Sequence, residues 1–590
     1  MGTISDKLMR IINTKEDIRQ ALISKGYDVP TSIPFKEYAK MISDLPCRVD
    51  SFPDIEGIVA RYSALDLTNE QMKENPVWVD KTGNGHDLQM KNFAWGGMSG
   101  VGGYSDNFSS YSWKKPSYRS DITWTSSSFN ITRVMNTGVQ IYYFSAWEES
   151  ESVIPEKRII VKGLEDGQVL RYMNVGNRII EISQDGIYTI PSFTFKGANS
   201  YHGYSLAKKQ ESCNVTVEQL PLYPGALVFD GVDDWAGCDN LPLLPKEKGY
   251  SIIALRNWIT RYDATQYKRP LISNLDTNDE GAFLIEYRKD ENVNDVTGSY
   301  NSFTDVYIDD NNPITWQTSS SYNGQIIKKG TSKSTNKLCI CKTYFGQLSN
   351  YANAAIWELI ILDHDATEEE LTKIKDYFVK TYPWLFPDQA WTVTGKTNED
   401  EDRATIANIT GNSNDLVLSN FGFVEGSGYN EEGEYAGYLV TDGVDDKVVS
   451  AESIAFTDTW TIITDTVFLG KVSVASCILA SNIFTVYNYQ GSGTIAVTMG
   501  EGGSSLRVIT SSIKAFSSDG TIYDAEWNEY HVEIGTIRAL ERLLKIGTSS
   551  NETSYFCQLA FKFLGIYNNQ ILSKDDCIKA YNYLQTLKAK

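Results

Sequence analysis

Two short acidic clusters are the residues of this chain best suited to binding chemistry. Each contains three aspartates in a copy of one phrase: Asp230, Asp233 and Asp234 in LVFDGVDD, and Asp442, Asp445 and Asp446 in LVTDGVDD. Carboxylates at this spacing could bind Ca²⁺, but that ion takes about six to eight oxygen ligands and three aspartates supply only part of the shell. An Asp-Gly pair is also typical of a tight turn, in which the carboxylate accepts backbone hydrogen bonds. We favour the turn, and we predict neither a metal ligand nor a cofactor.

Four aromatic residues are candidates for stacking against sugar rings. They lie in stretches rich in Gly and polar residues: Trp95, Tyr104, Trp235 and Tyr429. Exposed rings surrounded by Asn, Asp and Gly can form a glycan-binding surface. Burial in a core is the alternative for each ring, and Lys447 replaces Trp235 after the second DGVDD phrase. The two parts of the chain therefore cannot bind a glycan alike through that position.

The sequence contains none of the residue patterns that we associate with catalysis. A sugar-cleaving β-sandwich needs carboxylates along one strand face, as in E-x-D-x-x-E, and this spacing does not occur. Histidine is found only at 86, 202, 364 and 531, in unrelated contexts, and Asn414 replaces His86 in the repeat described below. There is no G-x-S-x-G, phosphate-binding loop or H-E-x-x-H motif. We therefore predict no catalytic residues and no enzymatic activity.

The net charge of the chain restricts its partners. At −21 it argues against nucleic acid, since binding phosphates requires concentrated Lys and Arg, and against an anionic membrane surface. No run of 18 apolar residues occurs, and MGTISDKLMRIINTK has no apolar signal region. The eight cysteines lie far apart, which favours core packing over a disulfide framework. We expect no membrane segment and no encoded route to secretion.

The acidic phrases belong to a long internal repeat. TGNGHDLQMKNF at 82–93 matches TGNSNDLVLSNF at 410–421 with an offset of 328, and TNE at 68–70 matches 397–399 with an offset of 329. An apolar strand and a helix are expected to close each copy, at 357–378 and 563–584. The DGVDD phrases are only 212 residues apart, so the first copy holds 116 more residues between its landmarks. We infer a duplicated domain with an insertion in its first copy.

The remaining segments differ in kind from the repeat. Short strand patterns such as KRIIVKG and GIYTIPSFTF, separated by Gly and Asp turns, predict a small immunoglobulin-like β-sandwich at 107–222. TKEDIRQALISKG and PFKEYAKMISDL predict capped and amphipathic helices within 1–46. The expected division is a helical N-terminal anchor at 1–46, a first sandwich at 55–106 and 223–386 around the insertion at 107–222, and a second sandwich at 387–590.

The order TGNxxDL, DGVDD turn, apolar strand, final strand and terminal helix resembles the concanavalin A-like, laminin-G-like jelly roll. The N-terminal TKEDIRQALISKGYDVPTSIPFKEYAKMI, with KGLEDGQVLRYMN and KKQESCNVTVEQLP from the insertion, is similar to segments of virion appendage proteins of crAss-like phages that infect Bacteroidetes. The first resemblance implies a mainly β fold with two jelly-roll sandwiches, the first interrupted by the smaller sandwich. The second implies a structural protein of the head, collar or tail, such as a fibre or spike.

We therefore expect a non-enzymatic virion protein, assembled in the host cytoplasm and attached to other virion proteins through its N-terminal helices. Its sandwiches would be displayed for attachment, with a host or mucosal glycan as the candidate ligand. A homo-oligomer, of which a trimer is one form, would multiply weak contacts. Two alternatives stay open: a carbohydrate-binding protein of the bacterial surface, and a glycan-degrading enzyme.

Overall fold

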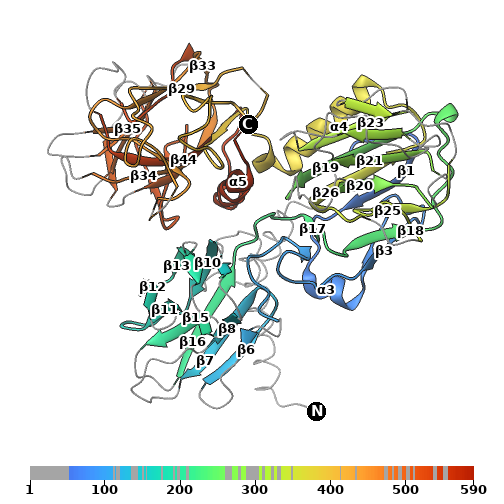
Figure 1. The fold of residues 1–590 in the computed structure, drawn as a ribbon, viewed down its shortest axis with the longest axis horizontal. Helices are drawn as coiled ribbons and strands as arrows, with labels where there is room; N and C mark the ends of the chain where they lie inside the picture. The colour runs from blue at the N-terminus through green and yellow to red at the C-terminus, as the bar shows by residue number, and fades with distance from the viewer. Residues whose placement is uncertain are drawn as a thin grey trace, which may run out of the picture. The chain divides into compact units, whose positions relative to one another are not determined.

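The computed structural model describes most of residues 52–589, and this part is mainly β (Figure 1). The longer stretches outside the description are 115–119, 135–143, 196–199, 208–211, 260–268, 277–280, 288–303, 308–312, 320–324, 329–333, 471–475, 489–494, 500–504, 536–540 and 549–555. The helices predicted within 1–46 also lie outside the described residues. The described helices are α3 (Asn69–Glu74), α4 (Glu368–Thr381) and α5 (Lys574–Thr586), with 3-10 turns η1 (Lys246–Lys248) and η3 (Pro383–Leu385). None of the three helices is long and apolar enough to cross a membrane.

The first sandwich consists of two sheets that use strands from both sides of the insertion. One sheet contains β1 (Ile58–Ser63), β4 (Gly100–Val101), β17 (Leu227–Asp230), β19 (Ser251–Trp258), β23 (Ile314–Thr318) and β26 (Asn353–Leu362). The other contains β2 (Val77–Trp78), β3 (Leu88–Lys91), β18 (Trp235–Cys238), β20 (Arg269–Ser273), β21 (Phe283–Tyr287), β22 (Thr304–Tyr307), β24 (Gln325–Lys328) and β25 (Leu338–Ile340). Because β1 pairs with β26, β4 with β17 and β3 with β18, the segments 55–106 and 223–386 share both sheets.

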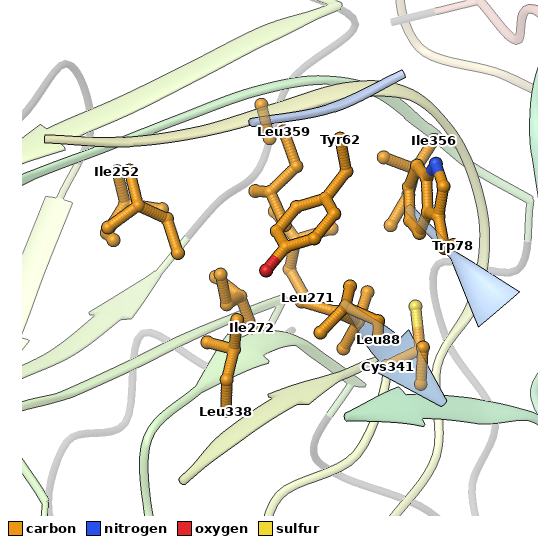
Figure 2. Packing of buried hydrophobic residues seen from close by; sticks show 14 of the residues in the cluster. Tyr62, Trp78, Leu88, Ile252, Leu271, Ile272, Leu338, Cys341, Ile356 and Leu359 are labelled. Carbon is orange, nitrogen blue, oxygen red and sulfur yellow. The ribbon is translucent and has the colours of Figure 1, made fainter. Parts of the chain in front are cut away.

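One hydrophobic core lies between these two sheets. Figure 2 shows Tyr62 and Trp78 among aliphatic side chains from both sheets, including Leu271 and Leu359. The polar ends of the two rings are satisfied: the Tyr62 hydroxyl donates to the carbonyl of His86, and the Trp78 indole donates to a β1 carbonyl at 2.9 Å. All eight residues of β19 are buried, as its apolar run SIIALRNW predicts.

The insertion forms its own pair of sheets. One has the strand order β13-β10-β16-β7-β6, the second has the order β12-β11-β15-β8-β5, and β14 pairs with β9. The bounds are β5 (Trp113–Lys114), β6 (Ser120–Trp124), β7 (Ser128–Val134), β8 (Phe144–Glu148), β9 (Ser152–Ile154), β10 (Lys157–Lys162), β11 (Val169–Asn174), β12 (Asn177–Ile182), β13 (Gly186–Ile190), β14 (Phe193–Phe195), β15 (Ser200–Ala207) and β16 (Ser212–Gln219). Its core is separate from that of the first sandwich and contains Phe129, Ile159, Tyr204 and Val217.

The second sandwich repeats the architecture of the first. One sheet has the order β30-β31-β44-β34-β39-β40-β41 with β27 beside β44, the other has β28-β29-β32-β43-β35-β36-β37-β38, and β33 pairs with β42. The bounds are β27 (Gln389–Thr392), β28 (Thr405–Ile406), β29 (Leu416–Ser419), β30 (Gly428–Asn430), β31 (Tyr438–Val440), β32 (Lys447–Ser450), β33 (Ile454–Ala455), β34 (Trp460–Phe468), β35 (Ser476–Ser481), β36 (Phe484–Asn488), β37 (Ile495–Met499), β38 (Ser505–Val508), β39 (Ile513–Ser517), β40 (Thr521–Asp524), β41 (Glu529–His531), β42 (Glu541–Arg542), β43 (Lys545–Ile546) and β44 (Leu559–Asn568).

Corresponding strands show where the insertion enters. In the second sandwich β30 and β31 are an antiparallel pair joined by residues 431–437, whereas in the first the equivalent pair, β4 and β17, is joined by 102–226. The central pairs of both copies also contain a bulge at the same place, after Leu255 in β19 and after Asp465 in β34. The predicted fold class is therefore confirmed: the chain is mainly β, with two related sandwiches and a smaller one inserted into a hairpin connection of the first.

The TNE motif of each copy has a structural role. The Asn69 side chain accepts from the backbone N–H of Val101 at 2.7 Å and donates to the carbonyl of the same residue at 3.2 Å. Asn398 makes the same two bonds with Tyr429, both at 2.8 Å. The side-chain amide of each asparagine thus bonds both the N–H and the carbonyl of one residue, as the backbone of a neighbouring strand would. This explains why the repeat keeps Asn at a position outside the sheets.

The cysteines of the described residues are all buried and unpaired: Cys213, Cys238, Cys339, Cys341, Cys477, Cys557 and Cys577. This agrees with the prediction that they pack in the core rather than form a disulfide framework, and Cys47 lies outside the described residues. Burial raises the pKa of the described thiols, for example that of Cys238 to about 11. These thiols are therefore protonated and unreactive near neutral pH.

Candidate functional site

The two DGVDD phrases form the turns that their composition predicts. In the first, Oδ1 of Asp230 accepts from the backbone N–H of Val232 at 2.8 Å, and Oδ2 of Asp234 accepts from the N–H of Asp230 at 3.1 Å. The second turn repeats these bonds, Val444 N–H to Asp442 at 2.7 Å and Asp442 N–H to Asp446 at 2.8 Å. Within each triad one carboxylate oxygen per residue lies within 4.8 Å of the others. The hydrogen bonds engage these carboxylates in closing the turn, which agrees with the turn interpretation.

The last aspartate of each turn is unusual in its electrostatics. Asp234 and Asp446 are buried, and Oδ1 of each has no hydrogen-bond partner in the described structure. Burial, reinforced by the charge of Asp230, raises the pKa of Asp234 to about 7. Burial also raises the pKa of Asp446 to about 6. Both carboxyls therefore titrate close to neutral pH, where ordinary aspartates are fully ionised.

This burial predicts a pH dependence of stability. Between about pH 4 and 7 the folded chain keeps a proton on Asp234 that the unfolded chain has lost, so the free energy of unfolding should fall as the pH rises. We expect the contribution of this site to fall by about 2 kcal/mol between pH 5 and 7. Urea unfolding of the wild type and of Asp234→Asn at several pH values measures it, because the variant lacks the titration. If the free energies of unfolding of the two proteins differed by the same amount at every pH, the raised pKa would not belong to Asp234.

Three of the four candidate aromatic residues are held by packing. Trp95 stacks against Phe93, with ring centroids 4.7 Å apart, and both rings lie against the first core. Tyr429 is buried in the second core and donates its hydroxyl to a backbone carbonyl of Arg403 at 2.8 Å. Tyr104 is half-buried, and burial raises its pKa. For these three residues the alternative of burial describes the structure better than a sugar-binding surface.

Trp235 is the exception, because it lies on the outer face of its sheet. Along β18 the side chains of Ala236 and Cys238 enter the core, so Trp235 and Gly237 face away from it. Trp235 is half-buried and meets Phe345 edge to face, with centroids 5.8 Å apart and an interplanar angle of 85°. A Cβ on Gly237 would lie 2.7 Å from the Trp235 ring and 3.3 Å from that of Phe345. The glycine thus leaves room for the two rings on the sheet.

A lysine completes this group. Nζ of Lys342 lies 4.1 Å from the centroid of the Trp235 ring and 5.8 Å from that of Tyr351. Lys342 is 6% exposed, and its ammonium group has no hydrogen bond or ion pair with any described residue. Burial lowers its pKa. We call Trp235, Gly237, Lys342, Phe345 and Tyr351 the outer-face site of the first sandwich.

A second lysine lies at the border of the outer-face site. Nζ of Lys337 is 4.8 Å from the centroid of the Phe345 ring and 3.9 Å from a carboxylate oxygen of Asp239. The carboxylate of this pair is 69% exposed, so the ion pair is largely solvated and weak. Lys337 therefore differs from Lys342, for which no carboxylate of the described residues forms an ion pair.

At two described positions the second sandwich has other residues in place of those that form this site. Ala236 pairs with Ile340 in the first copy as Val448 pairs with Ile546 in the second, which fixes the correspondence of the strands. Counting from these pairs, Trp235 corresponds to Lys447 and Lys342 corresponds to Thr548. Sequence comparison identified the first difference but missed Lys342 and Phe345, which a loop brings back over the sheet. The ring-rich stretch CKTYFGQLSNY at 341–351 was the available signal.

The histidines do not gather into a site. His202 lies in the insertion and contacts the Tyr172 hydroxyl through Nδ1 at 2.6 Å, while His364 and His531 lie beside the carboxylates of Asp363 and Glu529. Each of the three therefore has a local partner of its own.

No protein-family model matches the chain, and no match was found among curated proteins. Among solved structures, a Trypanosoma rangeli sialidase in complex with sialic acid is similar with a TM-score of 0.24 and 8% identity, over 79% of this chain and 83% of the sialidase. The binding domain of botulinum neurotoxin serotype C1 gives a TM-score of 0.20 and 9% identity, over 59% of this chain and 91% of the domain. Similarities of this size indicate neither a shared fold nor a shared activity.

Proposed function

We propose that this chain is a non-enzymatic attachment protein of a phage virion that binds glycans through the outer-face site of its first sandwich. The observation that carries the glycan part is the site itself: two perpendicular rings above a glycine, bordered by an ammonium group. Sugar-binding sites combine an apolar surface for the C–H face of a ring with a few polar groups for the hydroxyls. Trp235 and Phe345 supply the first requirement, and Lys342 and Lys337 supply donors for the second.

The arrangement of the chain suits display rather than turnover. A single site of this size gives weak binding. Several copies on one particle would strengthen it, because once one copy is bound the next copy meets the glycan at a high effective concentration. A homo-oligomer, for which a trimer is one form, would provide those copies. The second sandwich, which has Lys447 and Thr548 in place of the ring and the ammonium, would act as a structural spacer. Residues 1–46 would attach the assembly to other virion proteins.

The glycan part is tested by binding of the full chain to an array of capsular polysaccharides from gut Bacteroidetes. We expect the wild type to bind a subset and Trp235→Lys to lose at least about tenfold in affinity for that subset, because the ring supplies the stacking surface. The substituted residue is the one found at the equivalent position of the second sandwich, so the fold should accept it. Lys447→Trp is the matched control and should leave binding unchanged. Equal binding by the wild type and Trp235→Lys would refute the assignment of the site.

The virion part is tested separately. Antibodies against the chain should decorate purified phage particles in immunogold electron microscopy and should not label uninfected bacteria. Labelling of uninfected cells would favour the alternative of a bacterial carbohydrate-binding surface protein. Release of sugars from a bound polysaccharide by the purified chain would favour the other alternative, a glycan-degrading enzyme.

A further inference from the structure

We infer that the glycan bound at the outer-face site carries carboxylates, and that one of them pairs with the ammonium group of Lys342. This inference rests on the proposed function, since it names the chemical class of the ligand for the same site. The distinguishing observation is a lysine that is only 6% exposed as a residue and whose ammonium group has no carboxylate partner among the described residues.

The environment of Lys342 makes a counter-ion favourable. Removing an ammonium from water costs free energy unless a partner compensates, and the ring of Trp235, 4.1 Å away, compensates only in part. The lowered pKa of Lys342 reflects the same burial. Most of the Lys342 side chain is already covered in the free protein, so a ligand carboxylate gains the attraction at a smaller further cost of desolvation.

A second lysine of the same chain illustrates the partnered case. Nζ of Lys579 lies 4.4 Å from the centroid of the Trp384 ring, a distance close to that between Lys342 and Trp235. Unlike Lys342, it is also 2.6 Å from a carboxylate oxygen of Asp575 and 3.6 Å from one of Asp576. A lysine stacked on a tryptophan in this chain can therefore also have a carboxylate partner. Beside Lys342 none of the described residues supplies such an anion, and in the inferred complex the ligand carboxylate does so.

The net negative charge of the chain excludes a simpler explanation for a preference for acidic polysaccharides. At −21 the protein repels polyanions at long range, so non-specific attraction cannot explain a preference for an acidic polysaccharide. The acidic residues close to the site also oppose binding of a polyanion. Asp239 borders the site, and burial raises the pKa of Tyr351, to which the charge of Asp233 adds. A preference for carboxylated sugars must therefore come from a short-range contact, for which Lys342 is positioned.

The test uses immobilised polygalacturonate, hyaluronan and alginate, each compared with its carboxyl-reduced form. We expect the full-length wild type to bind at least one acidic polymer about tenfold more tightly than the reduced form, the size expected of one hydrogen-bonded charge pair. Lys342→Met should bind both forms equally, with the affinity of the wild type for the reduced form. Lys579→Met is the matched control, because it also removes a lysine stacked on tryptophan, and it should keep the preference.

The outcomes separate this inference from the proposed function. Equal binding of acidic and reduced polymers by the wild type, or a preference that survives in Lys342→Met, overturns the role of the carboxylate and leaves glycan attachment standing. Failure to bind any acidic polymer overturns the inference as well, while binding to neutral polysaccharides on the capsular array would still support attachment. Loss of binding on that array too would overturn both. Thermal unfolding of each variant verifies that the substitutions leave the fold intact.

Discussion

Replacing Arg61 with methionine is expected to lower the free energy of unfolding of the first sandwich by about 3–5 kcal/mol, the cost of leaving one member of a buried ion pair alone. Nε of Arg61 lies 3.3 Å from Oε2 of Glu358, and both side chains are buried. The Tyr382 hydroxyl donates to Oε1 of the same carboxylate at 2.7 Å. Burial raises the pKa of Glu358, and the charge of Arg61 opposes that rise. Without the arginine the carboxylate would have to be protonated or exposed to water.

Urea unfolding measures this cost, and a second variant identifies its cause. The double variant Arg61→Met with Glu358→Gln keeps an acceptor for the Tyr382 hydroxyl but buries no charge. It should recover most of the stability that Arg61→Met loses, because the unpaired charge is the main cost. A single variant that loses less than about 1 kcal/mol, or a double variant that is no better, would show that the pair is solvated.

Gly231→Ala should destabilise the chain by about 3 kcal/mol, whereas Gly83→Ala should cost only about 1 kcal/mol. Both glycines have a positive φ, +77° and +78°, so both substitutions carry the strain of a left-handed residue. At Gly231 the new Cβ would also lie 2.7 Å from the Cβ of Asn353 and 3.0 Å from its backbone nitrogen. At Gly83 no atom lies within 4 Å. The difference between the two variants therefore isolates the cost of crowding.

The second sandwich offers an independent repeat of that comparison. Gly443 has φ +76°, and a Cβ there would lie 2.9 Å from the backbone nitrogen of Gln558, whereas Gly411 has φ +89° and open space around it. Urea unfolding should again rank the crowded variant as the more destabilised one. Equal losses within either pair would mean that strand β26 or β44 can move away from the turn, and that the turn does not fix the position of the strand beside it.

The fold was largely predictable because its landmarks are local. An Asp-Gly turn such as that at Asp230 is held by bonds between residues two to four positions apart, so the sequence phrase and the structure coincide. The nested insertion followed from a difference between two offsets in the sequence. Equivalent positions that hold different residue types were harder to predict. The Tyr62 hydroxyl donates to the carbonyl of His86, and the Trp391 indole donates to the carbonyl of Asn414, the equivalent residue of the second copy. Because one residue is a tyrosine and the other a tryptophan, the sequence repeat did not reveal this correspondence.

The site was predictable only in part, because its members meet through the sheet. Trp235 stood out as a ring beside a turn, but its neighbours Phe345 and Lys342 are more than 100 positions away in the sequence. Their approach depends on the pairing of β18 with β25 and on the loop that follows β25. Tyr429 and Trp235 both lie in stretches rich in Gly and polar residues, yet Tyr429 is buried in the core of the second sandwich. The two rings differ because successive residues of a strand face opposite sides of the sheet. Composition alone could not determine which side each ring takes.

The central claim is that a glycan binds to the outer face of the first sandwich and not to the equivalent face of the second. Amide hydrogen exchange of the full-length wild type, with and without a saturating bound polysaccharide, tests this most directly. The account predicts slower exchange in β18 and in the segment 341–346, and unchanged exchange in β32 and at 545–548. Protection of the second sandwich alone, or of neither region while the polysaccharide is bound, would contradict it.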